Sequence, residues 1–224
     1  MRYLVFFLTL YACIVLYLRR ACWRDPTSVF FQPENAHVPG YSTTRISQAN
    51  SYIEETLFTS PAKWNPSSRP KICIGLASVQ REGISYLKST VGSLQEGLSR
   101  QERESLYFVA LLAHTDQTQH QEYAQPWLME TVDRLPTYHD DPDRLSLARR
   151  LELDGSHNLK ARFDYSIVLE ECAKVNPMFT MMVEDDVVAI DGWYHRTLEA
   201  LEKAYTFSAE MGRTSCKWSR APWR

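Results

Sequence analysis

The chain has 224 residues, 44% of them hydrophobic and 23% charged, with a formal net charge of −2. These values fit one globular domain with at most an added stem, and they argue against a protein that binds nucleic acid or anionic surfaces in general. The five cysteines show none of the paired spacings that mark a zinc site.

An apolar run opens the chain. Residues 3–18, YLVFFLTLYACIVLYL, carry no charge, and residues 21–23 can lengthen the run towards the ~20 residues that span a bilayer. No small-x-small cleavage site follows, so an uncleaved signal anchor over residues 1–23 is favoured over a cleaved signal peptide. Charge alone fixes its orientation poorly, because more arginines follow the run than precede it.

Residues 24–70 are polar and carry many of the prolines, which indicates a stem, with one short helix expected around Ile46–Leu57. Residues 71–210 are predicted to form the folded domain. Residues 211–224 show no apolar periodicity and are predicted to be an irregular tail.

The start of the predicted domain has the pattern of a parallel sheet. Lys71–Val79 and Leu106–Ala113 are apolar runs of strand length, and Ile84–Leu98 between them carries apolar residues three or four positions apart. Strand, helix and strand at this spacing predict a βαβ crossover, and therefore an α/β fold.

Polar residues follow both predicted strands. Because the carboxyl ends of parallel strands meet at one edge, where ligands bind, we expect Val79, Arg81 and Asp116 to face a common crevice. Arg81 could meet a phosphate there, and Asp116 a ribose or a base. The ordinary alternatives are a surface arginine near a helix start and an aspartate that caps a turn.

The middle of the chain carries weaker signals. Residues 117–157 are mostly polar and are predicted to be irregular apart from a helix near Tyr123–Leu135, whereas Asn158–Val175 is predicted to be helical. Lys160 and Asp164 lie four positions apart and share a helix face, where such a pair is usually a weak surface interaction. The predicted buried stripe of this helix is Leu159, Phe163, Ile167 and Cys172.

Cys73 and Cys172 both lie in apolar segments. Their simplest interpretation is as buried thiols that pack as small hydrophobic residues. A disulfide between them in an oxidising lumen is the open alternative.

Three acids follow the last predicted strand. Phe179–Val183 has the pattern of a buried strand, and Glu184, Asp185 and Asp186 come directly after it. Buried carboxylates are costly unless they are solvated or bind a cation, and Mg²⁺ or Mn²⁺ commonly binds one or two carboxylates together with substrate phosphates. The cluster can therefore hold a metal that carries a nucleotide diphosphate, and the alternative is a solvated acidic turn. A further helix is predicted after Trp193.

Several of these stretches together resemble a known family. They are ICIGLASVQREGISYL, the HTD after the second strand, NLKARFDY, VEDDV and DGW, within roughly Lys71–Ala204. The combination resembles the GT-A-type glycosyltransferases that include N-acetylglucosaminyltransferase IV and the GPI-glycan N-acetylgalactosaminyltransferase of the post-GPI-attachment group. The resemblance is greatest to the GPI-modifying branch, and it implies a GT-A-like sheet with flanking helices behind one transmembrane helix.

The resemblance implies roles for the acids. Glu184, Asp185 and Asp186 occupy the family's DXD-like position, where Asp186 would contact Mn²⁺ or Mg²⁺, and Glu184 would reach the ribose or a metal-bound water. The implied donor is a UDP-sugar, whose diphosphate leaving group the metal would neutralise.

The resemblance also implies that other residues line the donor site. Val79 and Arg81 match the donor-binding end of the first strand. Lys160, Asp164 and Tyr165 match a helix beside the nucleotide-sugar, which would make the Lys160–Asp164 face functional.

The implied activity is transfer of an N-acetylhexosamine to a mannose-containing glycan in GPI-anchor side-chain modification. The implied location is the Golgi membrane, or else the endoplasmic reticulum, with a single-pass type II topology. The nearest alternative is an N-glycan-branching N-acetylglucosaminyltransferase. A hydrolase built on the same acids is a further alternative, but it lacks a second His/Asp cluster.

Chains of this family continue well beyond the acidic motif. The chain is therefore expected to be a truncated product that holds a partial GT-A domain, without the C-terminal half that carries the acceptor site and the general base. This expectation favours another alternative, a non-catalytic, membrane-tethered nucleotide-sugar-binding fragment.

Overall fold

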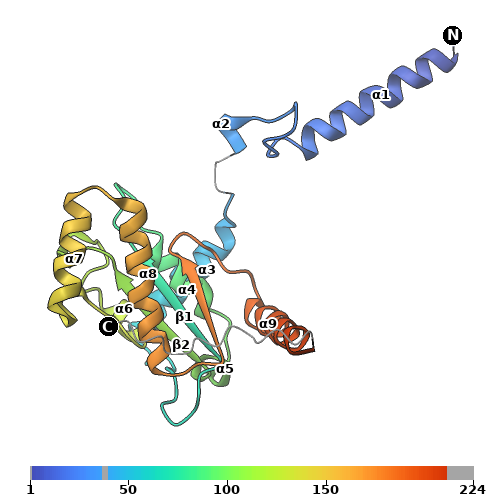
Figure 1. Cartoon of the computed structure of the whole chain (residues 1–224). Coiled ribbons are helices and arrows are strands. Elements are labelled where there is room, and N and C mark those ends of the chain that lie inside the picture. Colours follow the sequence, from blue (N-terminus) through green and yellow to red (C-terminus); the bar gives the residue numbers. More distant parts are fainter. Residues whose placement is uncertain (1, 37–39, 211–224) are drawn as a thin grey trace. The chain divides into compact units, whose positions relative to one another are not determined.

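A computed structural model describes residues 2–36 and 40–210 of the chain (Figure 1). It divides into two compact units, Met1–Tyr41 and Ser42–Arg224. The irregular tail predicted for residues 211–224 lies outside the described residues.

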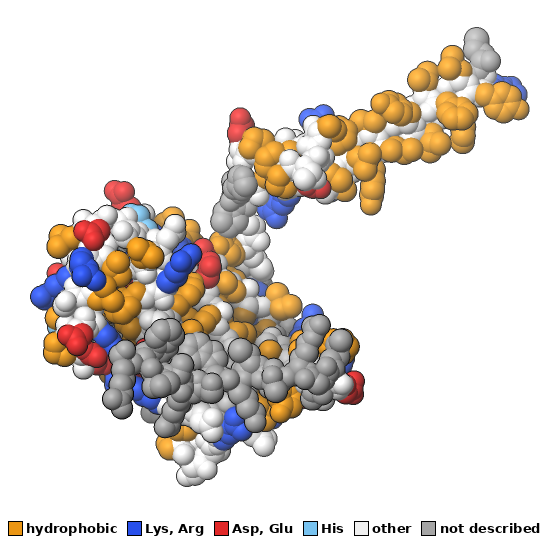
Figure 2. Space-filling view, in the orientation of Figure 1, with side chains coloured by type: hydrophobic (Ala, Val, Ile, Leu, Met, Phe, Trp, Pro, Cys, Tyr) orange, Lys and Arg blue, Asp and Glu red, His pale blue; other side chains and the backbone are white. Residues whose placement is uncertain are grey.

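The first unit contains α1 (Arg2–Ala21) and the short α2 (Pro33–Ala36). Helix α1 has a mean hydropathy of 1.7 and is long and apolar enough to cross a membrane, although a signal sequence would have the same properties. Figure 2 shows hydrophobic side chains exposed along its whole length.

The second unit is built on a three-stranded parallel sheet in the order β2-β1-β3. The strands are β1 (Ile72–Ser78), β2 (Leu106–Leu112) and β3 (Phe179–Glu184). The helices are α3 (Thr43–Thr56), α4 (Leu87–Gln95), α5 (Arg100–Glu104), α6 (Pro126–Thr131), α7 (Pro142–Leu153), α8 (His157–Lys174) and α9 (Trp193–Glu210), with 3-10 turns η1 (Gln117–Gln119) and η2 (Tyr138–Asp140). The predicted α/β class and parallel sheet are confirmed.

Alternate side chains of β1 enter two different cores. Ile72, Ile74 and Leu76 pack in the core that includes α4, whereas Cys73 packs in the core of α8. The sheet therefore lies between two helical layers, with α3 and α4 on one side and α7 and α8 on the other (Figure 1). Helix α3 packs on α4, so this part of the predicted stem belongs to the second unit.

Two glycines allow unusually close packing. A Cβ on Gly75 would lie 2.4 Å from Val168 Cγ1, and a Cβ on Gly92 would lie 2.4 Å from the carbonyl oxygen of Ala49. Both distances are shorter than real contacts allow, so α8 can approach β1, and α3 can approach α4, only because these residues lack a side chain.

The structure corrects three boundary and burial predictions. Helix α4 does not extend over Ile84–Leu98, because Ile84 pairs with Arg81 across a turn and is half exposed. Strand β3 is only partly buried, since it is an edge strand and pairs with β1 alone among the described strands. Leu159, predicted to be buried in α8, is 53% exposed.

Helix α7 lies in a segment that was predicted to be irregular. Asp141 caps it, with its carboxylate accepting from the backbone N–H of Asp143 and Arg144, and Pro142 occupies the first turn. An aspartate followed by proline is a helix-start signal, so the sequence contained the information. The helix predicted near Tyr123–Leu135 exists in a shorter form as α6.

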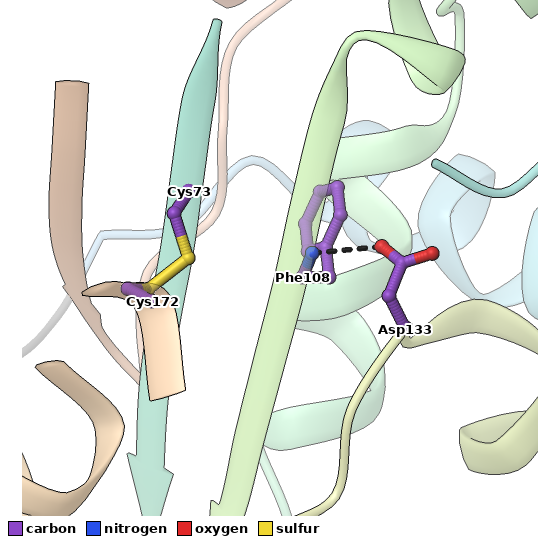
Figure 3. Close-up of a disulfide and its surroundings, with 4 residues drawn as sticks. All are labelled: Cys73, Phe108, Asp133 and Cys172. Atoms are coloured by element: carbon purple, nitrogen blue, oxygen red, sulfur yellow. Dashed lines mark hydrogen bonds between the residues drawn. A yellow bond between two sulfur atoms is a disulfide. The ribbon is translucent and has the colours of Figure 1, made fainter. Parts of the chain in front are cut away.

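The outer edge of β2 is covered by residues 133–134 rather than by a strand. The N–H groups of Asp133 and Arg134 donate to the carbonyl of Phe108, and the N–H of Ala110 donates to the carbonyl of Arg134. The Phe108 N–H donates to Asp133 Oδ2 at 2.8 Å (Figure 3). The same carboxylate, 5% exposed, accepts from Arg103 at 3.1 Å. A buried aspartate thus completes the hydrogen bonding of a sheet edge.

The structure contains the disulfide that was the alternative interpretation of Cys73 and Cys172. Cys73 in β1 and Cys172 in α8 form a disulfide, with a sequence separation of 99 (Figure 3). It joins the central strand to the helix that covers it. Cys13 and Cys22 in the first unit are free.

Asp133→Ala is expected to lower the free energy of unfolding by about 3–5 kcal/mol, because it leaves Arg103 buried without its charge partner and the Phe108 N–H without an acceptor. Urea unfolding followed by circular dichroism measures this. The matched control is Asp154→Ala at an exposed position, and equal losses in the two variants would contradict the assigned role.

Replacing Cys73 and Cys172 together by alanine is expected to cost roughly 2–5 kcal/mol, because the disulfide closes a long loop in the unfolded chain. The same loss should appear when the wild type is reduced before unfolding. Replacing Cys13 and Cys22 should leave the unfolding of the second unit unchanged. A wild type indifferent to reductant would show that the bridge does not support the fold.

Candidate functional site

The carboxyl ends of β1 and β3 meet at a topological switch point. The chain leaves β1 towards β2 on one side, and β3 returns to the other side of β1. Such a point is where open α/β sheets bind ligands. Arg81 follows β1, and Asp185 and Asp186 follow β3, so both predicted groups arrive there.

Asp185 is the centre of this cluster and is only 5% exposed. Its Oδ1 accepts from Arg81 at 2.9 Å, and its Oδ2 accepts from the Ser78 hydroxyl at 2.5 Å. The Thr90 hydroxyl, on α4, donates to its carbonyl oxygen at 2.6 Å. Both carboxylate oxygens are engaged, so the charge of Asp185 is balanced inside the protein.

Ser78 connects Asp185 to a buried histidine. His120 Nε2 lies 3.1 Å from Ser78 Oγ, and His120 Nδ1 accepts from the backbone N–H of Glu122 at 3.1 Å. Since Nδ1 accepts, Nε2 carries the proton and donates to Ser78, which in turn donates to Asp185. Burial lowers the pKa of His120, which keeps this neutral tautomer.

His114 holds the segment that follows β1. Its Nε2 accepts from the backbone N–H of Gln80 at 2.8 Å, and burial lowers its pKa. The Gln80 side chain accepts from the N–H of Gln121 at 2.8 Å. These bonds tie the segment after β2 to the segment after β1.

The other two acids differ from Asp185. Glu184 is exposed, and Asp186 is 34% exposed, with its Oδ2 3.5 Å from the Arg81 guanidinium. Burial first, and then the negative charges of Glu184, Asp185 and Asp186, raise the pKa of Tyr165. Tyr165 on α8 therefore lies within electrostatic range of the acids.

The positions of Val79 and Asp116 give weaker support for a role at this site. Val79 is 44% exposed at the crevice. The Asp116 carboxylate accepts from the N–H and hydroxyl of Thr118 and caps η1, and these bonds lower its pKa. Asp116 is thus the turn cap that was one of its two interpretations. The ordinary alternative for Arg81 was a surface arginine near a helix start. Arg81 does not start a helix, because α4 begins later, at Leu87.

Lys160 and Asp164 are not a surface pair. They are 7% and 2% exposed, and Lys160 Nζ lies 3.0 Å from both carboxylate oxygens of Asp164. Lys160 Nζ also donates to the Tyr138 hydroxyl and to the carbonyl of Ala113. Burial raises the pKa of Asp164, against the opposing effects of Tyr138 and Lys160. The pair is internally satisfied and anchors α8 to the end of β2.

Sequence reasoning did not find Ser78, Thr90, His120 or Tyr138. Ser78 has a weak signal, as a hydroxyl at the end of an apolar strand where ligand-binding residues gather. Thr90 lies within a predicted helix, and His120 and Tyr138 lie in a segment predicted to be largely irregular. No local pattern there indicates which side chains turn inward.

The cluster presents both signs of charge to solvent. The Arg81 side chain is 40% exposed and lies over the ring of Tyr86 at 5.2 Å, so it can meet an anion. Within residues 2–36 and 40–210, no group of three or more His, Cys, Asp or Glu side chains is placed to hold a metal.

No family model, curated protein or solved structure matches this chain.

Two imidazoles with lowered pKa values, His114 and His120, predict a pH dependence of stability. The folded-state pKa values of His114 and His120 lie below the ordinary value of 6.5, so the unfolded chain binds more protons at mildly acidic pH. Stability is expected to be full above pH ~6.5 and to fall as the pH drops below it, by at most about 1.4 kcal/mol per pH unit for each histidine.

Melting temperatures between neutral pH and pH ~5 test this. His120→Gln should flatten the slope, because glutamine can still accept from Glu122 and donate to Ser78 without taking up a proton. His157→Gln, at an exposed position, is the control and should leave the slope as it is. Identical slopes in the two variants would show that His120 does not contribute to the pH dependence.

Proposed function

We propose that the second unit binds a nucleoside diphosphate-sugar at the carboxyl edge of its sheet, as part of a GT-A-like glycosyltransferase that uses a UDP-sugar. The observation that carries the proposal is the meeting of Arg81 with Asp185 and Asp186 at the switch point, at 2.9 and 3.5 Å. Arg81, a cation that can bind a diphosphate, lies beside Asp186, an acid that can bind the accompanying metal. Both lie at the sheet edge where such folds bind their ligands.

The charges suggest a division of roles. Arg81 is exposed enough to turn towards a phosphate, where a guanidinium forms paired hydrogen bonds. Asp186, with Glu184, would hold Mn²⁺ or Mg²⁺, which neutralises a diphosphate leaving group. Asp185, held by Ser78, would position its neighbours rather than bind the metal.

The proposed acceptor and location come from the resemblance. The acceptor is a mannose-containing glycan, in GPI-anchor side-chain modification, and the N-glycan-branching reaction remains the nearest alternative. The proposed location is the Golgi membrane, with α1 as a type II anchor. The Cys73–Cys172 disulfide supports a lumenal second unit, because disulfides persist in oxidising compartments.

One observation favours a second candidate, a nucleotide-sugar-binding chain without catalysis. Both imidazoles near the crevice, His114 and His120, accept from backbone N–H groups. Neither is therefore free to take a proton from an acceptor hydroxyl.

Calorimetric titration of the detergent-solubilised full chain with UDP, with and without Mn²⁺, tests the proposal. Wild type should bind UDP more tightly with Mn²⁺. Arg81→Gln should weaken binding by roughly ten- to a hundredfold through the lost charge-assisted hydrogen bonds. Asp186→Asn should remove the effect of Mn²⁺ and leave metal-free binding in place.

The matched control is Asp154→Asn, at an exposed position in α7's C-cap. Thermal melting of each variant separates lost binding from lost folding, since Arg81→Gln removes a partner of the buried Asp185. A folded wild type that ignores UDP under every condition would exclude the donor site. UDP binding without sugar transfer to any mannose-containing glycan would favour the second candidate.

A further inference from the structure

A polar pocket lies at the amino edge of the sheet, at the opposite end of the strands from the crevice. Its volume is about 690 Å³, within the range of pockets that take small ligands. It is lined by the segments that lead into β1 and β2 and by the carboxyl-terminal ends of α3 and α4. Strand β2 has seven residues, so it separates this pocket from the crevice by roughly 20 Å.

Two of the side chains that line the pocket are buried and polar. Gln95 and Arg103 are 2% and 3% exposed. Arg103 Nε donates to Gln95 Oε1 at 3.3 Å, and the guanidinium also donates to Asp133 at 3.1 Å and to the carbonyl of Thr131 at 2.9 Å. The buried part of the lining is therefore polar and held in place.

The segment that leads into β1 forms another wall, and three hydrogen bonds hold it. The N–H of Trp64 donates to Asp133 Oδ1 at 3.0 Å, and the N–H of Asn65 donates to the carbonyl of Glu104 at 3.2 Å. Lys63 Nζ donates to a backbone carbonyl in α6 at 2.7 Å. Bonds between segments far apart in the sequence thus build this pocket.

The charges of the described residues that line the pocket nearly cancel. Arg103 is paired with a buried aspartate, and Arg100 Nε lies 2.7 Å from a carboxylate oxygen of Glu104. One cation, Lys63, and one acid, Glu55, remain. Such a lining complements a polar ligand without net charge better than it complements an anion or a cation.

Tyr52 contributes a hydroxyl that the protein does not use. This side chain is half-buried, and its hydroxyl has no hydrogen-bond partner among the residues that the structure describes. Burial raises the pKa of Tyr52, against the opposing effect of Arg103, so the hydroxyl stays neutral and can both donate and accept. A ligand in the pocket would supply the missing partner.

The lining combines aromatic rings with neutral hydrogen-bonding groups. The rings are those of Tyr52 and Trp64, and the polar groups include the side chains of Ser60 and Asn65. Sugars present the matching surfaces, because their hydroxyls form hydrogen bonds and their C–H faces pack on aromatic rings. We propose that this pocket binds a neutral saccharide. Such binding would not depend on a nucleotide in the crevice, at the other edge of the sheet.

Calorimetric titration of the full chain with maltose, cellobiose and mannobiose, in a detergent without a sugar headgroup, tests the proposal. At least one of these disaccharides should bind. Tyr52→Phe should weaken that binding about three- to tenfold, through the loss of one hydrogen bond. It should leave the melting temperature unchanged, because the hydroxyl has no partner in the described protein. Tyr205→Phe on α9, where the side chain is 54% exposed, is the matched control and should bind as wild type does.

A second variant blocks the pocket. Ser60 is exposed and lines the pocket, so Ser60→Trp should fill the space and abolish saccharide binding without unfolding the chain. Titration of both variants with UDP keeps this site apart from the crevice, since each should behave towards UDP as wild type does. Failure of all three disaccharides to bind wild type, binding that survives Ser60→Trp, or equal binding by Tyr52→Phe and Tyr205→Phe would each overturn the proposal.

Discussion

A carboxylate that is nearly removed from water organises the second unit. Asp185 is charged and buried, and such a group destabilises a fold unless partners surround it. Its partners come from the end of β1, through Ser78 and Arg81, and from α4, through Thr90. The register of β3 on β1 is therefore coupled to the satisfaction of one charge, and α4 is held through the backbone carbonyl of the same residue.

Much of the fold could be predicted from the sequence, because local residue patterns mark its strands and helices. The three strands are apolar runs of strand length, so their existence follows from pattern, and the parallel pairing of β1 with β2 follows from spacing. The site could be predicted only at strand ends, as with Arg81. The partners of Asp185 could not, because whether Ser78 or His120 turns inward depends on packing between segments far apart in sequence. Lys160 shows the same limit, since a surface-like pair is buried by contacts from another segment.

The ion pairs of Arg81 determine which interactions an incoming ligand must replace. Arg81 is already paired with two acids, so an incoming anion competes with an internal interaction rather than meeting a free cation. A metal on Asp186 would lessen that competition, because it satisfies the acid while the guanidinium turns away. In such a site, anion and metal would favour each other's binding.

The disulfide between β1 and α8 limits how the crevice can adapt. It joins the start of β1 covalently to the carboxyl-terminal end of α8, seven residues beyond Tyr165, so that end of the helix stays against the sheet. Accommodation falls to the connections after β1 and β2, where Gly83 has a positive φ and no neighbour would obstruct it. Selectivity for ligand size would then reside mainly in these two connections.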